Sequence, residues 1–408
     1  MRHPIRLHVP SIASRIAFHV SRFTFQNPPM NIRRIGLGLL VSAVCLYFVL
    51  RGVQWDEVWR HLSEVDLLLF GLSMLLMLVA YFLMTWRWQH LLDPLEVPIS
   101  EPGIDDSLSA PNPSRGVRSH VNLLDLYGKM LTGYFFNAFF PARAGDLVRA
   151  YLLGRKTGLR KTTILATIVI EKAFDGIVLL VLLLLGLVIL PSVGASGVGG
   201  LDPDLLAWVA GAGIVAAIAG LGVFYMFSGQ IARLVEAIMA RLPLPDRLKR
   251  LAVRLIETFA GGMHVFKSPL PLLSAAAISV FVWLAVALMF LAGLMSFRTP
   301  FPLELTSIAG LFFITGLVNL GLLVPALPGN VGTYEALVVA AMAFFRVDKE
   351  LAVAFALIFH VGQLVVTLVV GLFAFWAQNM SLAEMRPVEA AAEREAERSL
   401  EEIERGSV

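Results

Sequence analysis

Residues 132–146 read TGYFFNAFFPARAGD, an apolar run that breaks at Pro141 and Gly145. A second run, residues 315–329, reads TGLVNLGLLVPALPG and breaks in a similar way. Both contain Thr-Gly, then Asn, then Pro-Ala and then Gly, with slight slippage between them. A backbone that is broken inside an apolar run cannot face lipid, because its N–H and C=O groups need partners. These two segments therefore decide the architecture that we predict.

The composition excludes a water-soluble domain. Of the 408 residues, 57% are hydrophobic and 15% are charged, and the mean hydropathy is +0.76. Soluble domains carry about 25% charged residues, so lipid must be the solvent for much of this surface. Cys45 is the only cysteine, which excludes an intramolecular disulfide, a zinc ribbon and a CxxC redox site.

Six apolar runs can cross a bilayer, for which about 20 helical residues are needed. They are Ile35–Leu50, which is short, Leu67–Trp86, Thr162–Leu190, Leu205–Phe227, Leu270–Phe297 and Leu351–Trp376. Two further runs, Leu123–Phe140 and Leu303–Leu327, contain the breaks.

The distribution of Lys and Arg predicts the orientation, because short cytoplasmic loops are rich in both. There are six Lys and Arg residues in 1–34, six in 143–161 and seven in 228–269, but none in 191–204. If the basic segments are cytoplasmic, 123–140 enters and leaves from that side, and 303–327 does so from the other. We therefore predict an all-α, multi-pass membrane protein with six full spans, two re-entrant hairpins in inverted repeat, and cytoplasmic termini. Eight full spans would leave a set of arginines on the wrong side.

The predicted membrane domain is residues 35–378, and polar segments surround or interrupt it. Residues 1–34 form a basic N-terminal segment, and residues 379–408 form a charged C-terminal tail. Residues 92–121 are rich in proline, which indicates a flexible cytoplasmic loop. Residues 229–260 carry apolar side chains at helical spacing opposite arginines. This pattern predicts either interfacial helices or a linker helix that packs on the bundle.

Charged residues inside the predicted spans are candidate functional residues, because each costs about 2.5–3.5 kcal/mol near the bilayer centre. Glu171 and Asp175 lie at i,i+4 on the third span, and Lys172 lies at i,i+3 from Asp175. They either line a polar path or form a salt bridge that only locks helix packing. We favour the polar path, since three charges exceed what packing requires. Arg87, between two tryptophans, is interpreted as an interfacial anchor.

The residues after the first break predict an anion site. Arg143, Asp146 and Arg149 follow it at i,i+3 spacing. A helix that begins there has free N–H groups, and a guanidinium binds two phosphate oxygens at once. The alternative is that these arginines are only topological signals. After the second break, Glu335 falls in the first turn of a half-helix, where a carboxylate also complements the helix dipole.

Several catalytic signatures are missing from the sequence. It contains no GxxxxGK[ST], HExxH, GxSxG or Cys/His metal cluster. We therefore expect no ATPase or hydrolase activity, no catalytic residue, cofactor or metal, and no nucleic-acid partner. His360 and Gln363 on the last span are interpreted as partners for interhelical hydrogen bonds.

Taken in order, these motifs resemble the membrane domain of the lysylphosphatidylglycerol synthase/flippase family. The resemblance covers about residues 35–378 and rests on Trp86-Arg87-Trp88, Asn137 to Arg149, Glu171-Lys172-x-x-Asp175, Asn319 and Pro328-Gly329-Asn330-x-Gly332-x-x-Glu335. The family usually has Glu-Arg in place of Glu171-Lys172 and Pro-Gly-Gly in place of Pro328-Gly329-Asn330. Lys172 therefore lacks the bidentate fork of arginine, and the turn at Asn330 differs.

The resemblance implies transfer of phospholipid, or a related anionic lipid, between the leaflets of a bacterial inner membrane. Two-domain members add a soluble aminoacyl-transferase domain, whereas only residues 379–408 follow the last span here, so lysyl transfer is not expected. The candidate substrate-binding residues are Asn137, Arg143, Asp146, Arg149, Glu171, Lys172, Asp175, Asn319, Gly329 and Glu335. One alternative is an accessory membrane protein that supports a lipid-modifying or glycosyl-transferring enzyme without transport of its own. Another is a membrane enzyme that uses Glu171 and Asp175 as its acid and base. Membrane lipids are the expected partners in each case.

Overall fold

The computed structural model describes residues 42–97, 115–117, 121–140, 144–159, 161–190, 270–322 and 328–378, with three isolated positions between 208 and 215. The N-terminal segment 1–34, the predicted interfacial helices 229–260 and the C-terminal tail 379–408 lie outside the described residues. Most of the predicted loop 92–121 lies outside them too. Its two ends are described, and they pair as an antiparallel ribbon of β1 (Glu96–Val97) and β2 (Arg115–Gly116).

Apart from this ribbon, the regular structure of the described residues is helical. Residues 42–50 are helical and are followed by α3 (Trp55–Ser63), α4 (Leu67–Leu92), α5 (Leu123–Phe139), α6 (Ala144–Thr157), α7 (Lys161–Ile189), α10 (Leu270–Met295), α11 (Leu303–Thr306), α12 (Ile308–Gly321), a 3₁₀ turn at Pro328–Asn330 (η4), α13 (Thr333–Phe344) and α14 (Lys349–Ala377). Side-chain caps help to start three of the helices. Asp66, Asn122 and Ser307 accept hydrogen bonds from backbone N–H groups in the first turns of α4, α5 and α12.

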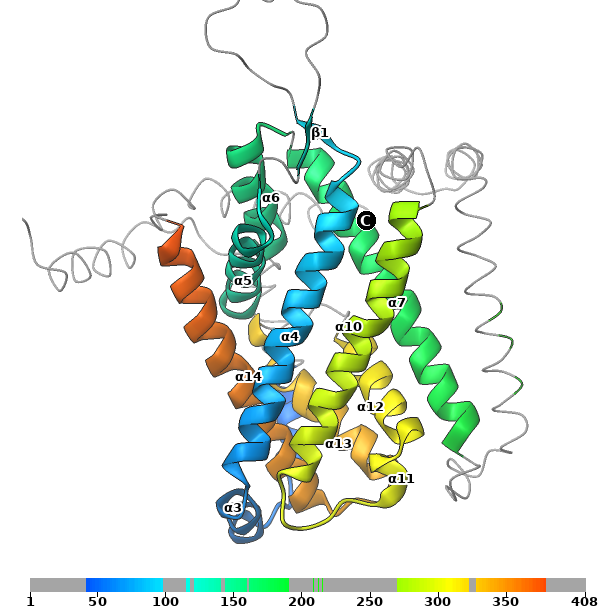
Figure 1. The fold of residues 1–408 in the computed structure, drawn as a ribbon. Helices are drawn as coiled ribbons and strands as arrows, with labels where there is room; N and C mark the ends of the chain where they lie inside the picture. The colour runs from blue at the N-terminus through cyan, green and yellow to red at the C-terminus, as the bar shows by residue number, and fades with distance from the viewer. Residues whose placement is uncertain are drawn as a thin grey trace, which may run out of the picture.

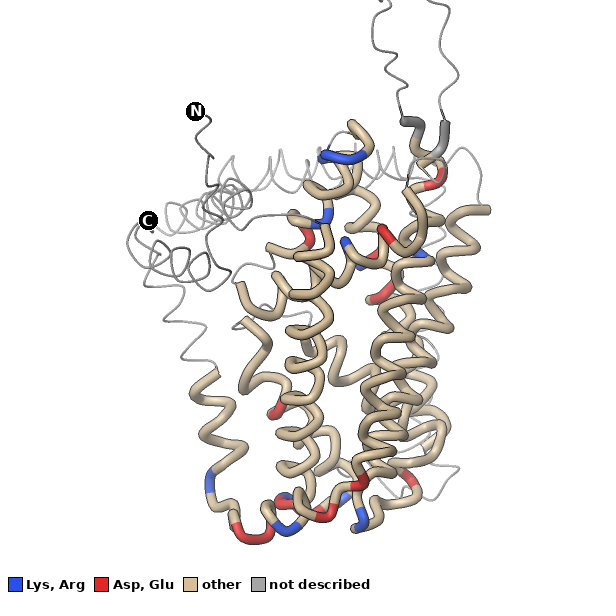
Figure 2. The backbone as a smooth tube through the Cα atoms, turned by 60° about the vertical axis from the view of Figure 1, so that its left-hand side comes forward, with Lys and Arg blue, Asp and Glu red and all other residues tan. Residues whose placement is uncertain are grey.

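Four of the described helices are long and apolar enough to cross a membrane. They are α4, α7 from Thr163, α10 and α14, and they correspond to four of the six predicted spans. Of the other two, Ile35–Leu50 is described only from residue 42, and Leu205–Phe227 only at isolated positions. The chain is therefore a multi-pass helical membrane protein. Charged residues gather near the two ends of the bundle, and few lie between them (Figure 2).

Two pairs of shorter helices lie beside the long ones. The pair α5 and α6 has 17 and 14 residues, and the pair α12 and α13 has 14 and 12. The members of each pair pack against each other. The α5–α6 pair lies near the β1 end of the bundle, whereas α12 and α13 lie toward the opposite end, near α11 (Figure 1).

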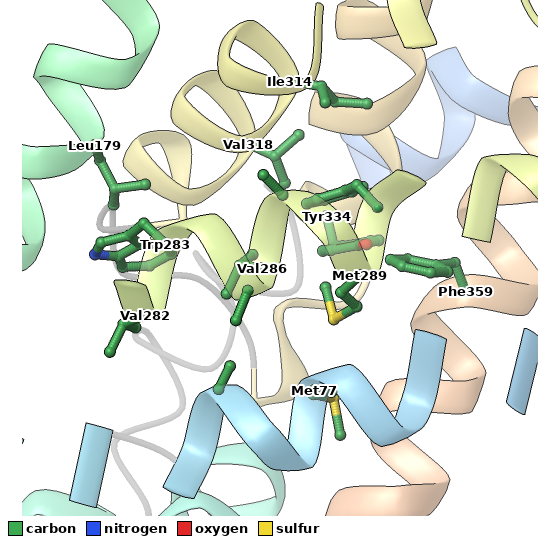
Figure 3. Packing of buried hydrophobic residues seen from close by; sticks show 14 of the residues in the cluster. Met77, Leu179, Val282, Trp283, Val286, Met289, Ile314, Val318, Tyr334 and Phe359 are labelled. Carbon is green, nitrogen blue, oxygen red and sulfur yellow. The ribbon is translucent and has the colours of Figure 1, made fainter. Parts of the chain in front are cut away.

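The core joins long and short helices into one bundle. Figure 3 shows side chains from α4, α7, α10, α12, α13 and α14 packed together, namely Met77, Leu179, Val282, Trp283, Val286, Met289, Ile314, Val318, Tyr334 and Phe359. Helices α7 and α12 come especially close, because Gly316 has no side chain. A Cβ atom there would lie 2.7 Å from Cβ of Leu183.

The described part of the second break lies beside the end of α5. A Cβ atom on Gly329 would lie 3.2 Å from the carbonyl oxygen of Ala138 and 3.4 Å from Leu364. The second break therefore lies between the last turn of α5 and the helix α14. Residues 141–143 of the first break and 323–327 of the second lie outside the described residues.

Candidate functional site

A network of buried ion pairs lies where α4, α6 and α7 meet. We call Arg87, Arg149, Glu171 and Asp175 the charge cluster. Arg87 donates from Nη1 to Oδ1 of Asp175 at 2.6 Å and from Nη2 to Oδ2 at 3.2 Å. Its Nη2 is also 3.4 Å from Oε1 of Glu171. The side chain of Arg87 is 0% exposed. The prediction that Arg87 is an interfacial anchor is therefore wrong, because such an anchor would reach the surface of the protein.

Arg149 on α6 completes the cluster. Its Nη2 donates to Oε2 of Glu171 at 2.7 Å, and its guanidinium lies 4.3 Å from the ring centre of Trp88. Asp146 is one turn away, with Oδ1 3.7 Å from Nη1 of Arg149. The Arg149 side chain is 1% exposed. Glu171 therefore bridges two arginines, with one carboxylate oxygen toward each.

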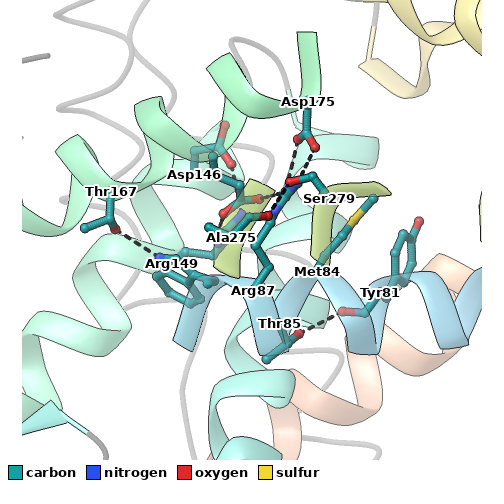
Figure 4. Close-up of polar contacts among 12 residues, drawn as sticks. Tyr81, Met84, Thr85, Arg87, Asp146, Arg149, Thr167, Asp175, Ala275 and Ser279 are labelled. Carbon is teal, nitrogen blue, oxygen red and sulfur yellow. Dashed lines mark hydrogen bonds and ion pairs between the residues drawn. The ribbon is translucent and has the colours of Figure 1, made fainter. Parts of the chain in front are cut away.

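Neutral side chains from neighbouring helices hold the cluster in place. Ser279 on α10 accepts a hydrogen bond from Arg87 at 2.9 Å, and Trp283 donates to Oδ1 of Asp175 at 3.1 Å. Trp88 donates to Thr167 at 3.1 Å, which fixes the ring that supports Arg149. Figure 4 shows Arg87, Arg149, Asp175 and Ser279 close to one another, from α4, α6, α7 and α10.

The cluster balances its charges but leaves hydrogen-bonding capacity unused. Two guanidiniums face two carboxylates, which lowers the cost of burying each ion. However, Nε of Arg87, Nε of Arg149, Oε1 of Glu171 and Oδ1 of Asp146 have no hydrogen-bond partner among the described residues. Buried polar atoms of this kind are uncommon in proteins. The arrangement therefore retains donors that a further acceptor, such as a phosphate oxygen, could use.

The first break is held by a neutral side chain. Asn137, near the end of α5, accepts a hydrogen bond from the backbone N–H of Gly145 at 2.8 Å. A Cβ atom on Gly145 would overlap the carbonyl oxygen of Gly133, and one on Gly133 would overlap Arg149. These two glycines therefore let α5 and α6 approach closely, and the space at Gly133 holds the stem of Arg149.

The second break is held by an acid and a histidine. Nδ1 of His360 lies 2.7 Å from Oε1 of Glu335, and Nε2 lies 2.8 Å from the carbonyl oxygen of Gly329. The other oxygen of Glu335 accepts from the N–H of Gly332 at 2.7 Å. By contrast, Asn319 donates to the carbonyl of Thr315 in its own helix.

The candidate residues thus fall into two groups. Asp146, Arg149, Glu171 and Asp175 come together around Arg87, whereas Gly329 and Glu335 come together around His360. Asp175 pairs with Arg87 rather than with Lys172, and Arg143 lies outside the described residues. Sequence reasoning missed the role of Arg87. The sequence did contain a signal for this role. Arg87 lies on a span without Asp or Glu, whereas the span of α7 carries both Glu171 and Asp175.

A second set of ion pairs joins α5 and α6 near the β1 end. Asp125 accepts from Lys129 at 2.7 Å and from Lys156 at 2.8 Å. Partial burial raises the pKa of Asp125, but hydrogen bonds from the two lysines outweigh it, and the pKa is lower than usual. Burial lowers the pKa of Lys129 despite its bond to Asp125.

The geometry defines a helical membrane protein with a buried charge cluster beside the first of its two chain breaks. The family model for the lysylphosphatidylglycerol synthase TM region matches residues 35–371. The chain therefore belongs to this family, as the sequence motifs predicted. It is also similar to a protein of Haloferax volcanii named Glycosyltransferase AglD, with 29% identity over 388 residues. That match covers 90% of this chain and 58% of the relative, so the chain spans less than two thirds of the relative's length.

Proposed function

We propose that this protein moves the headgroup of an anionic lipid between the leaflets of the cytoplasmic membrane, without enzymatic activity of its own. The observation that carries the proposal is the buried charge cluster beside the first break. Burying two arginines and two acids is expensive, and such residues in membrane proteins generally belong to substrate or ion pathways. In this proposal the termini are cytoplasmic, and the two short helix pairs are re-entrant hairpins in inverted repeat.

The bridging position of Glu171 supports an exchange of anions in the cluster. A phosphate and a carboxylate bind a guanidinium in the same planar, two-oxygen manner. A lipid phosphate can therefore take the place of Glu171 on Arg149, because Oε1 of Glu171 already faces Arg87 at 3.4 Å. Glu171 then remains paired instead of being left as an isolated buried anion.

The incoming phosphate needs one more positive charge, since the cluster is already balanced. Two residues of the sequence can supply it. Arg143 directly precedes α6, and Lys172 directly follows Glu171. We assign Arg143 to first contact with the phosphate. The acyl chains remain in lipid, so only the headgroup needs a polar route, along the breaks whose backbone cannot face lipid.

The test is transfer of a fluorescent phosphatidylglycerol in vesicles that contain the purified protein. Arg143→Ala should slow transfer strongly, and Arg143→Lys should restore it only in part, because an ammonium lacks the fork. The matched control is Arg60→Ala on α3, since Arg60 is 59% exposed and its one ion pair among the described residues is with its neighbour Glu57. If both Arg143 variants transfer lipid at the wild-type rate, the arginine is only a topological signal and the proposed anion site is wrong.

A second function is favoured by the name of the relative. The Haloferax volcanii protein is named a glycosyltransferase, and a large part of its length has no counterpart in this chain. In the second candidate function, this chain supports a separate glycosyl-transferring enzyme. Wild-type vesicles without any lipid transfer, together with stable co-purification of such an enzyme, would favour this role over the first.

A further inference from the structure

Glu335 and His360 form a closed ring of hydrogen bonds across the second break. The N–H of Gly332 binds one oxygen of Glu335, and the other oxygen faces Nδ1 of His360. The ring closes because Nε2 of His360 faces the carbonyl of Gly329, three residues before Gly332. The pair therefore fastens both ends of the loop Gly329–Gly332 to α14.

The hydrogen positions in this ring follow from the chemistry of its atoms. A carbonyl oxygen only accepts hydrogen bonds, so Nε2 of His360 must carry a hydrogen. The 2.7 Å contact between Nδ1 and Oε1 of Glu335 needs a second hydrogen, on the imidazole or on the carboxyl group. The two arrangements are an imidazolium with a carboxylate, and a neutral imidazole with a carboxylic acid, and both are neutral overall. With this one proton shared between Glu335 and His360, every contact in the ring is attractive.

Loss of the shared proton breaks the ring. With its remaining hydrogen on Nε2, a neutral imidazole turns the lone pair of Nδ1 toward the carboxylate of Glu335, and the two repel. Moving that hydrogen to Nδ1 would instead leave two lone pairs facing each other at Gly329. The closed loop therefore requires the shared proton, whereas an open loop does not.

The loop that the ring holds has an unusual backbone. Gly329, Asn330 and Gly332 have φ values of 70°, 55° and 87°. Such conformations are uncommon for residues other than glycine and persist where surrounding contacts hold them. The same loop contacts the end of α5 through Ala138, so its position bears on the first hairpin.

The surroundings add no other ionised group to the ring. Among the described residues, Tyr334 is the only further titratable side chain in hydrogen-bond, ion-pair or ring contact with the pair. It stacks on His360 with 4.3 Å between ring centres, and its hydroxyl accepts from Gln363. Residues 42–50 contribute the backbone carbonyl of Ser42 beside Gly332. Within the described part of the second break, the protonation of Glu335 and His360 therefore decides the charge.

We propose that Glu335 and His360 form a proton-binding site that holds the Gly329–Gly332 loop on α14, and that release of the proton frees the loop. The closed loop is favoured while the proton is bound, and it is lost as the pH rises. This site ties a proton to the position of the second break, whether or not the protein moves lipid.

The test measures loop mobility directly, without a transport assay. A nitroxide label is attached to Val331→Cys in a Cys45→Ser background, because Val331 is partly exposed within the loop. Spectra are then recorded across a range of pH in vesicles. The ratio of mobile to immobile label should rise with pH by up to about tenfold per unit, the limit for release of one proton.

Glu335→Gln separates proton binding from a purely structural role. The amide oxygen of glutamine accepts from Gly332, and its NH₂ donates to Nδ1 of a neutral His360, so every hydrogen bond survives without a shared proton. This variant should keep the label immobile as the pH rises, where the wild-type label becomes mobile. The matched control is His61→Gln, since His61 is buried but bonded to the neutral Thr299. It should leave the wild-type profile unchanged.

Two results would overturn the proposal. One is a wild-type label whose mobility does not change with pH, a measurement that needs no variant at position 335 or 360. The other is a Glu335→Gln profile with the same pH dependence as the wild type, which would place the titrating group elsewhere.

Discussion

Replacing Arg87 by methionine tests whether the charge cluster is part of the folded core. Methionine has a similar length but no charge. The variant removes three interactions at once, namely the two-oxygen contact with Asp175, the approach to Glu171 and the bond to Ser279. Arg149 still pairs with Glu171. Asp175 is left as a buried carboxylate whose one remaining hydrogen bond from a described side chain comes from Trp283.

Two estimates of the cost agree. Breaking a buried ion pair by removing one partner costs about 3–5 kcal/mol. A lone aspartate inside a membrane helix costs about 2.5–3.5 kcal/mol on insertion scales. At about 3 kcal/mol, the equilibrium constant for unfolding rises by more than about a hundredfold. An exposed arginine at an interface contributes about 1 kcal/mol or less. The free energy of unfolding therefore distinguishes Arg87 as an interfacial anchor from Arg87 as a member of the charge cluster.

A double variant separates lost charge balance from lost packing. Arg87→Met with Asp175→Asn removes one cation and one anion, so Arg149 and Glu171 remain as a balanced pair. The double variant should be more stable than Arg87→Met alone, although it carries one more substitution. Unfolding in mixed micelles, followed by tryptophan fluorescence, measures these differences. The control is Arg51→Met, because Arg51 is exposed near the end of the bundle.

Two outcomes would refute this reasoning. Arg87→Met could unfold within about 1 kcal/mol of the wild type, as expected for an exposed ion pair. Alternatively, the double variant could be less stable than both single variants, which would mean that Arg87 and Asp175 contribute independently rather than as a pair.

Three further predictions concern other parts of the chain. Gly145→Ala should destabilise the packing of α5 on α6 by about 1–3 kcal/mol, because the new methyl group overlaps the carbonyl oxygen of Gly133. The control Gly176→Ala should not destabilise the protein, because no other described side chain or segment lies within 4 Å of its Cβ position. Equal stability of the two variants in thermal unfolding would contradict this prediction. Because the pKa of Asp125 is lowered in the folded protein, its ionised carboxylate stabilises the fold above its usual pKa, and this stabilisation disappears as the pH falls. The difference in unfolding free energy between wild type and Asp125→Asn should therefore shrink on acidification. A difference that stays constant would exclude the linkage. Finally, an impermeant thiol reagent applied from outside should label Val198→Cys and spare Arg155→Cys in a Cys45→Ser background, and the reverse pattern would invert the proposed topology.

The sequence predicted the long helices and the breaks because both depend on local signals. Apolar runs of the required length were found as α4, α7, α10 and α14. Pro and Gly clusters marked where α5 and α12 end. The resemblance to a family was also readable, because its motifs are short and occur in a fixed order, and the family match confirms it.

The partners of the charged residues could not be predicted, because they depend on how helices face each other. Spacing along one helix suggested that Lys172 pairs with Asp175, but Arg87 arrives from α4, 88 positions away, and takes that carboxylate. The same limit applies to Glu335. Its place in a first turn indicated a helix-dipole interaction, whereas the contact with His360, 25 positions later, requires α13 and α14 to pack together.

The two hairpins share a sequence pattern but use different polar chemistry at their breaks. Asn137 holds the first break with a neutral amide and leaves nearby arginines as the charged groups. The second break is held by an acid and a histidine whose contacts depend on a proton. Because Ala138 touches Gly329, neither break can move far without disturbing the other. In our two proposals an anion binds at the first break and a proton at the second, so both would act on this contact, which is the physical condition for coupling the two.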